Sequence, residues 1–171
     1  FESDRPHLSG FIIKELSTIQ SNWRSRGSLE GFLKETKVFG IQGIDTRALT
    51  RRIREKGAQQ AILSTNTSDP QSLIEKARKS PNLIGKDLVK EVTCKSSYDW
   101  DESEWTIQRG KTELKKIEDR SYNVLVYDFG VKRNILRKLT RAGCKVTVVP
   151  ANTSADEVLA KNPDGIFLSN G

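Results

Sequence analysis

The chain has 171 residues, of which 35% are hydrophobic and 30% are charged, and its formal net charge at pH 7 is +7. This length allows one ordinary domain or two small ones, with room for a sizeable core. No apolar run approaches the roughly 18 residues that a membrane-spanning helix requires, so we expect a soluble protein with no membrane partner.

Residues 1–95 combine short apolar runs with amphipathic stretches. Ser28 and Asp45 stand where helix caps belong, and Asp69 followed by Pro70 is typical of a helix start. The predicted strands are 10–16, 39–44 and 58–64, and the predicted helices are 28–38, 46–57 and 70–80. We therefore expect a mixed α/β unit in this part of the chain.

The excess of positive charge peaks in the helix predicted after Asp45, where Arg47, Arg51 and Arg54 share one face. A basic helix can neutralise phosphates, but no base-stacking aromatic residues are interleaved with this one, and no nucleic-acid-binding signature accompanies it. We therefore expect no nucleic-acid partner. The three arginines form either a solvated face or a contact with a partner protein.

Residues 96–120 are polar, net acidic and without sustained periodicity, so their composition predicts a linker. Trp100 and Trp105 are too apolar to be left fully exposed, which predicts that the linker lies along a domain surface. The carboxylates of this segment are expected to form a solvated acidic patch rather than a metal or acid–base site. They are Asp99, Asp101, Glu102 and Glu104.

Residues 121–171 alternate between compact apolar runs and amphipathic stretches. Gly143 stands where a helix-ending glycine belongs, and Ser154 and Glu157 have capping-box spacing. The predicted strands are 122–127, 144–150 and 165–170, and the predicted helices are 131–143 and 154–162. This order indicates half of a doubly wound parallel sheet, which cannot cover both of its faces alone. We expect more strands and helices to follow Gly171.

One candidate site lies where the first strand of this sheet ends. Asp128 ends the buried strand, Gly130 allows an unusual backbone angle and Lys132 opens the next helix. Asp128 either faces the ligand-binding edge of the sheet or only caps that helix. The triplet Asp-Phe-Gly also occurs in protein kinases, but the other kinase motifs are missing. The Ser169–Gly171 loop is either an ordinary turn or one whose N–H groups face a carboxylate or oxyanion.

Neither cysteine has the surroundings that a nucleophile requires. Cys94 and Cys144 are far apart and outside any CxxC spacing, which predicts neither a metal site nor a disulfide and favours a reducing cytosolic or plastid compartment. The only histidine, His7, stands in a stretch with no defined element. Because a cysteine nucleophile needs a base within hydrogen-bond reach, we expect this chain alone to lack nucleophilic hydrolysis.

Several stretches together resemble one family, the small, glutamine-hydrolysing subunit of carbamoyl phosphate synthetase. GIDTRALTRRIREKGAQQAIL, residues 43–63, resembles the family's aspartate-threonine-arginine helix, and ESDRP and SNWRS fit the segments before it. VYDFGVKRNILRKLTRAGCKVTVVP, residues 126–150, and the later NPDGIFLSNG are similar to the opening of its amidotransferase domain. The resemblance covers essentially the whole chain.

The resemblance implies an α/β architecture in two parts. Residues 1–95 correspond to the later portion of a swivelling β/β/α N-terminal domain, and residues 96–120 to the linker. Residues 121–171 correspond to the first half of a flavodoxin-like class I glutamine amidotransferase domain, so the chain resembles a part of the subunit.

The resemblance also implies a function for the full-length protein. It would hydrolyse L-glutamine and channel ammonia to the large subunit of carbamoyl phosphate synthase (glutamine-hydrolysing), a ligase that serves arginine and pyrimidine biosynthesis. ATP and magnesium would be used by that large subunit, with no cofactor in this one. The expected assembly is a cytoplasmic heterodimer, located in the plastid stroma in a plant or alga.

Few residues inherit a role from the resemblance. Gly171 matches the first glycine of the loop that contacts glutamine. Lys132, and Asp128 in the same motif, match positions at the domain interface close to the ammonia tunnel. The face made by Arg47, Arg51 and Arg54 becomes a candidate contact for the large subunit. The family's Cys-His-Glu triad has no counterpart here, so the 171 residues alone are predicted to be inactive.

Two other functions stay open at this point. One is a non-catalytic binding or docking module with the same fold. The other is the amidotransferase subunit of another synthetase, which would share the domain of residues 121–171 but would not predict that of residues 1–95.

Overall fold

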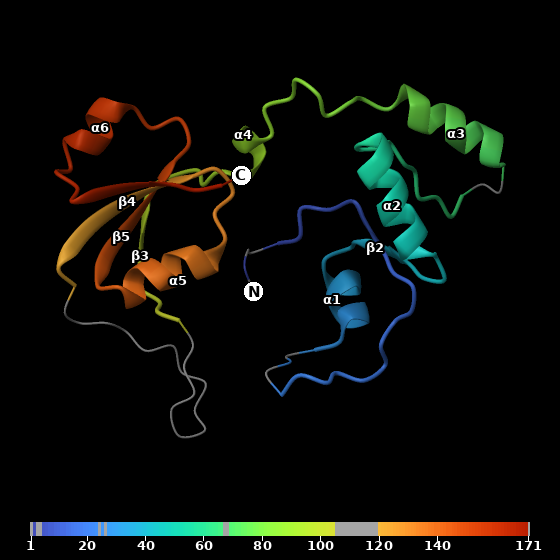
Figure 1. Ribbon diagram of the computed structural model, residues 1–171, viewed down its shortest axis with the longest axis horizontal. Coiled ribbons are helices and arrows are strands. Elements are labelled where there is room, and N and C mark those ends of the chain that lie inside the picture. Colours follow the sequence, from blue (N-terminus) through green and yellow to red (C-terminus); the bar gives the residue numbers. More distant parts are fainter. Residues whose placement is uncertain are drawn as a thin grey trace. The chain divides into compact units, whose positions relative to one another are not determined.

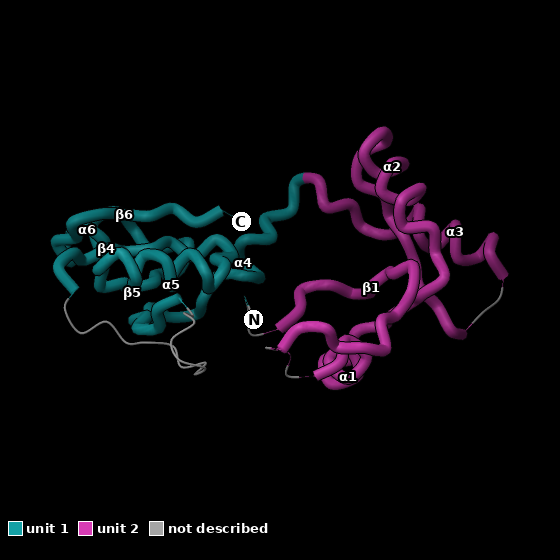
Figure 2. Tube along the Cα trace, turned by 60° about the horizontal axis from the view of Figure 1, so that its bottom comes forward, with its two compact units in different colours: residues 1–4, 85–171 teal, residues 5–84 magenta. Residues whose placement is uncertain are grey.

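The computed structural model describes residues 2, 5–23, 25, 27–66, 69–104 and 120–170. The chain divides into two compact units, which Figure 2 colours separately. The N-terminal unit comprises residues 5–84, and the sheet unit comprises residues 1–4 and 85–171. None of the described helices is long and apolar enough to cross a membrane.

The N-terminal unit forms short strands and helices (Figure 1). In chain order they are β1 (Gly10–Ile12), α1 (Leu29–Glu35), β2 (Phe39–Ile41), α2 (Thr46–Lys56) and α3 (Pro70–Lys79). β1 and β2 pair in parallel. Ser28, Asp45 and Asp69 each accept a hydrogen bond from a backbone N–H of the helix that follows. The three helix starts predicted from caps are confirmed, because these side chains satisfy N–H groups that lack a partner inside the helix.

The strand predicted at residues 58–64 is wrong, since the structure assigns no strand there. Leu63 packs against β1 by its side chain: a Cβ placed on Gly10 would lie only 2.4 Å from Leu63 Cδ1. Gln60 Nε2 donates to the carbonyl oxygen of Ser80 at 2.7 Å. The segment therefore attaches through side chains, and its apolar residues do not require a backbone ladder.

The described residues of the N-terminal unit include no fully buried side chain. Large apolar side chains are exposed instead, among them Trp23 at 68%, Phe39 at 64% and Ile84 at 86%. The buried apolar side chains of the described residues all lie in the sheet unit. Burial of apolar surface is the main favourable contribution to folding, so this unit holds the described core.

The sheet unit is built on a four-stranded sheet of order β3-β5-β4-β6. Its elements are α4 (Val89–Val92), β3 (Tyr98–Trp100), β4 (Tyr122–Asp128), α5 (Arg133–Arg141), β5 (Cys144–Pro150), α6 (Ala155–Leu159) and β6 (Gly165–Leu168). β4 pairs in parallel with both β5 and β6, whereas β3 is antiparallel to β5. The predicted alternation of parallel strands and helices is confirmed, as is the turn at Gly143, which has φ +91°.

The two faces of the sheet carry separate apolar clusters, because successive residues of a strand point to opposite faces. Val126, Val146 and Val148 pack with Leu136 of α5. Leu125 and Val149 pack with Val158 of α6 on the other face. Figure 1 shows α5 and α6 on opposite sides of the sheet. β6 is less covered, and its Ile166 and Leu168 are 47% and 65% exposed.

The start of the segment expected to be a linker, 96–120, is part of the sheet. Tyr98 to Trp100 form β3, which pairs along the outer edge of β5. The Trp100 ring packs against the α5-side cluster, and its Nε1 donates to the carbonyl oxygen of Glu102 at 2.8 Å. Polar composition misses this strand because an edge strand is held by backbone hydrogen bonds. Trp105 and the rest of 105–119 lie outside the described residues.

Two acidic residues after β3 bind the basic face of α5, a contact that the expectation of a solvated patch did not include. Arg137 Nη2 lies 3.4 Å from Glu102 Oε2, and Arg141 Nη1 lies 2.6 Å from Glu104 Oε2. The hydrogen bond from Arg141 holds the pKa of the Glu104 carboxyl below its usual range. Opposite charges from distant parts of the sequence thus meet on one helix.

The amino end of α5 is capped by a residue from the start of the chain. The carbonyl oxygen of Glu2 accepts the Arg133 N–H at 3.2 Å, and Glu2 Oε2 accepts the Asn134 N–H at 2.8 Å. Lys132 is the N-cap residue but makes no side-chain capping bond. Glu2 therefore supplies the negative group that favours a helix amino end.

Replacing Leu136 by alanine should destabilise the sheet unit strongly, because this side chain is fully buried between α5 and the sheet. The expected loss in free energy of unfolding is about 2–5 kcal/mol. Denaturant unfolding monitored by far-UV circular dichroism measures it. Leu159→Ala is the matched control, because Leu159 is 57% exposed on α6. Equal losses for the two variants would contradict the assigned core.

Candidate functional site

The carboxyl ends of β4 and β6 form the point where the order of the parallel strands reverses. The chain passes from β4 to β5 on one side of β4 and then returns to place β6 on its other side. In open α/β sheets, ligands bind in the crevice at such a reversal, outside the carboxyl ends of the strands. The residues that leave these two strands are Asp128 to Val131 and Ser169 with Asn170. They define the candidate site, which we call the switch-point site.

Asp128 anchors the switch-point site through three backbone N–H groups. Its Oδ1 accepts those of Gly130 at 3.0 Å and Val131 at 2.9 Å, and its Oδ2 accepts that of Cys94 at 2.8 Å. Only 6% of Asp128 is exposed. Its carboxylate shapes the turn before α5 and ties it to the segment after α4. These contacts leave its predicted role at a domain interface untested.

Asp128 also alters the chemistry of Cys94. Partial burial, and then the negative charge and hydrogen bond of Asp128, raise the pKa of the Cys94 thiol to about 11. A cysteine nucleophile needs the thiolate form. The raised pKa therefore disfavours the thiolate of Cys94 near pH 7. Cys144 is buried in β5.

Ser169 joins the two strand ends of the switch-point site directly. Its hydroxyl oxygen accepts the Phe129 N–H at 2.9 Å, and its own N–H donates to the Tyr127 carbonyl oxygen at 3.3 Å. Ser169 is only 5% exposed, whereas Asn170 after it is exposed. The last described residues of the chain therefore leave the sheet from a fixed point.

The neighbouring end of β5 is held by similar bonds. Thr93 Oγ1 accepts the Ala151 N–H at 2.9 Å, and the Tyr127 hydroxyl donates to the Thr153 carbonyl oxygen at 3.0 Å. The segment of Thr93 and Cys94 thus contacts the ends of both β4 and β5. Sequence reasoning did not find these contacts, because no local pattern links residues so far apart in the chain.

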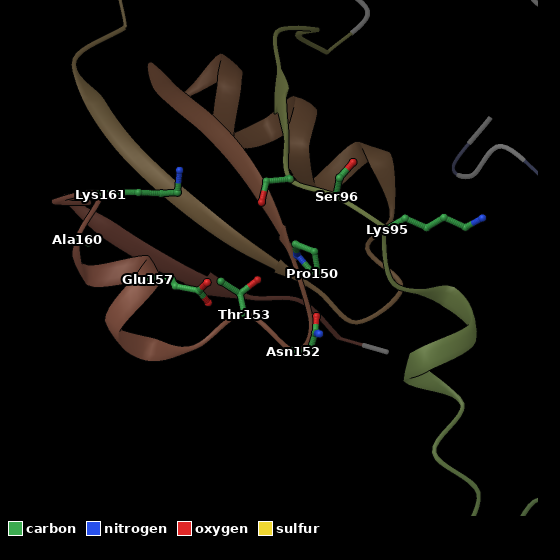
Figure 3. A pocket seen from close by; sticks show the side chains of 9 residues that line it. Lys95, Ser96, Pro150, Asn152, Thr153, Glu157, Ala160 and Lys161 are labelled. Carbon is green, nitrogen blue, oxygen red and sulfur yellow. The ribbon is translucent and has the colours of Figure 1, made fainter.

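A groove of about 650 Å³ lies beside the end of β5 (Figure 3), and Ser169 is not among the residues that line it. It is lined by Lys95, Ser96, Ser97, Pro150, Asn152, Thr153, Glu157, Ala160 and Lys161. Figure 3 shows the side chain of Lys95 extending away from Glu157 and Thr153. Glu157 is already engaged: its hydrogen bonds with Ser154 hold its pKa below the usual range.

The structure places the remaining predicted site residues as follows. Lys132 is exposed at the start of α5, and Gly130 has φ +106°, as expected for that turn. Gly171 lies outside the described residues. Among the residues that the structure describes, no group of three or more His, Cys, Asp or Glu could hold a metal ion.

The three arginines of α2 belong to the N-terminal unit. All three are exposed along the helix, and none of them forms an ion pair with another described residue. They are Arg47, Arg51 and Arg54. This arrangement fits either a solvated face or a partner contact and does not separate the two.

Two family models match the chain, in the order of its two units. Residues 1–63 match the carbamoyl-phosphate synthase small chain, CPSase domain, and residues 125–171 match the class-I glutamine amidotransferase. Curated proteins named carbamoyl phosphate synthase small chain are similar to nearly the whole chain. The protein of Syntrophotalea carbinolica is 57% identical over 170 residues, and that of Vibrio parahaemolyticus is 51% identical over 171. The protein of Escherichia coli K12 is 48% identical over 171 residues.

The alignments cover a much larger fraction of this chain than of its relatives. In each of these three relatives the alignment takes in 99% of this chain but 45% of the relative. The chain therefore spans about half the length of the curated relatives that it matches.

Replacing Asp128 by asparagine should lower the pKa of the Cys94 thiol, because the negative charge that opposes thiolate formation is removed. Burial remains and is the larger cause, so the pKa should stay above its ordinary value of 9.0. The rate of alkylation by iodoacetamide against pH, measured in a Cys144→Ser background, gives this pKa. An unchanged profile in a folded Asp128→Asn protein would show that Asp128 does not act on Cys94.

Proposed function

The chain belongs to the carbamoyl phosphate synthase small-chain family, and on this premise we propose that the complete protein containing it is a glutamine amidotransferase subunit. The observation that carries the proposal is the identity of 57% with such a small chain over 170 residues, across both units. An amidotransferase that serves another synthetase would need only the sheet unit. The match of residues 1–63 to the small-chain model favours carbamoyl phosphate synthase.

In the proposed reaction, water cleaves the side-chain amide of L-glutamine to give glutamate and ammonia. The ammonia passes through an internal tunnel to a large subunit, which combines it with bicarbonate at the expense of ATP, with magnesium, to form carbamoyl phosphate. No cofactor is proposed for the small subunit itself. The product would serve arginine and pyrimidine biosynthesis in the cytoplasm, or in the plastid stroma of a plant or alga.

We further propose that the sheet unit contains the first half of a flavodoxin-like amidotransferase domain, and that residues 1–95 belong to a swivelling β/β/α domain. The strand order β5-β4-β6 supports the first part, because the flavodoxin-like order begins with the second, first and third parallel strands. The described residues of the N-terminal unit offer one short parallel pair, β1 and β2, toward the second part.

The proposed roles of single residues follow from the family and from exposure. Gly171 would contact glutamine, and Lys132, exposed at the start of α5, would face the tunnel entrance. The exposed arginines of α2 would contact the large subunit. Asp128 binds three backbone N–H groups, and it would act at the domain interface near the tunnel by holding the turn that carries Lys132.

The proposed function is tested with the complete product of the gene that encodes these residues, copurified with a carbamoyl phosphate synthase large subunit. Carbamoyl phosphate should form from bicarbonate and ATP with glutamine as the nitrogen donor. Ammonia as the donor is the control, because it bypasses glutamine hydrolysis. Activity with ammonia but none with glutamine would leave a docking module as the better description.

The 171 residues alone should release no glutamate from glutamine. The raised pKa of Cys94 keeps its thiol protonated near neutral pH, and Cys144 is buried in β5. Coupled glutamate dehydrogenase detection measures the release, with the complete protein as the positive control. Release that Cys94→Ser or Cys144→Ser abolishes would contradict this prediction and make that cysteine a nucleophile.

A further inference from the structure

We propose that Ser169 is a positioning residue for glutamine, acting through the backbone that follows it at the switch-point site. The inference rests on the proposed function and adds to it a residue that has no assigned role there. It depends on how the hydrogen-bond ladder between β4 and β6 ends.

The ladder between these strands is regular up to its last pair. Tyr127 lies opposite Leu168, and the Ser169 N–H donates to the Tyr127 carbonyl oxygen at 3.3 Å. In a continuing parallel ladder, the next bond would run from the Phe129 N–H to the backbone carbonyl oxygen of Ser169. The structure has a different bond: the Phe129 N–H donates to the Ser169 hydroxyl oxygen at 2.9 Å.

The side-chain hydroxyl therefore takes the place of the backbone carbonyl at the end of β6. This substitution ends the strand without leaving the Phe129 N–H unpaired, and it releases the following backbone from the sheet. An unpaired N–H in a partly buried position would carry a free-energy cost. The serine at this position consequently decides where β6 stops and where the loop of Asn170 begins.

The donor side of the bond is equally constrained. Asp128 precedes Phe129 and binds the N–H groups of Gly130 and Val131 just after it. The Phe129 side chain stacks on Tyr127, with ring centroids 5.9 Å apart. Because the peptide carrying the Phe129 N–H is held from both sides, the Ser169 hydroxyl meets a donor in a fixed place.

Loss of the hydroxyl should let the ladder continue. The Phe129 N–H would then pair with the Ser169 carbonyl oxygen, and β6 would lengthen by one residue. Successive residues of a strand point to opposite faces, so this change would redirect Asn170. Groups of that loop that bind a ligand at the switch point would then be misplaced.

The test measures glutamine-dependent and ammonia-dependent carbamoyl phosphate synthesis by the complete protein with its large subunit. Ser169→Ala should raise the KM for glutamine by roughly tenfold, the equivalent of one net hydrogen bond, with kcat changed less than about twofold. Ser169→Cys keeps the shape but has a weak acceptor, so its KM should rise severalfold. The ammonia-dependent rate should not change. Ser121→Ala, at an exposed position before β4, is the matched control.

Each outcome decides the inference. A raised KM for glutamine with an unchanged ammonia-dependent rate supports it. An unchanged KM in either folded variant overturns it, and so does failure of Ser169→Cys to fold and assemble, because Ser169 would then serve folding. Absence of glutamine-dependent synthesis in the unsubstituted protein would instead reject the proposed function, so the two failures are distinct.

Discussion

The sheet unit depends on a buried carboxylate that holds three backbone N–H groups. Asp128 binds those of Gly130 and Val131 in the turn before α5, and that of Cys94 from the segment after α4. A turn leaving a parallel strand exposes N–H groups that no neighbouring strand can satisfy. The carboxylate satisfies them from inside the protein and so fixes the direction in which the chain leaves β4. Both the start of α5 and the bond to Ser169 follow from that direction.

Charge has a related effect on α5. One face of the helix carries several arginines, whose positive charges repel one another. The carboxylates of Glu102 and Glu104 bind two of them, Arg137 and Arg141. The ring of Trp100 lies under Arg133 and Arg137, with 5.9 and 5.7 Å between each guanidinium carbon and the ring centroid. Exposed ion pairs stabilise a protein little. Their effect here is to hold the segment after β3 against the helix, beside the edge of the sheet.

The sequence predicted those parts of the fold that depend on neighbours in the chain. Ser28, Asp45 and Asp69 start helices where expected, because a cap acts within three residues of itself. Apolar runs located β4, β5 and β6 for the same reason. The strand expected at 58–64 was a wrong prediction. The apolar side chain of Leu63 packs beside Gly10, and the structure assigns no strand to the segment. β3 was missed because backbone pairing leaves little mark on side-chain composition.

The same distinction between local and long-range contacts applies to the candidate site. By itself, the sequence determined the residue types at the strand ends, Asp128 with Gly130 and Ser169 with Asn170, and the resemblance to a small-chain family, since both are properties of consecutive residues. Only the tertiary structure decided what those residues contact. Cys94 and Ser169 are 34 and 41 positions from Asp128 in the chain. They reach β4 because the segment after α4 donates a backbone N–H to Asp128 and because β6 pairs beside β4. Such pairings arise when distant strands assemble into one sheet, and no local sequence pattern encodes them.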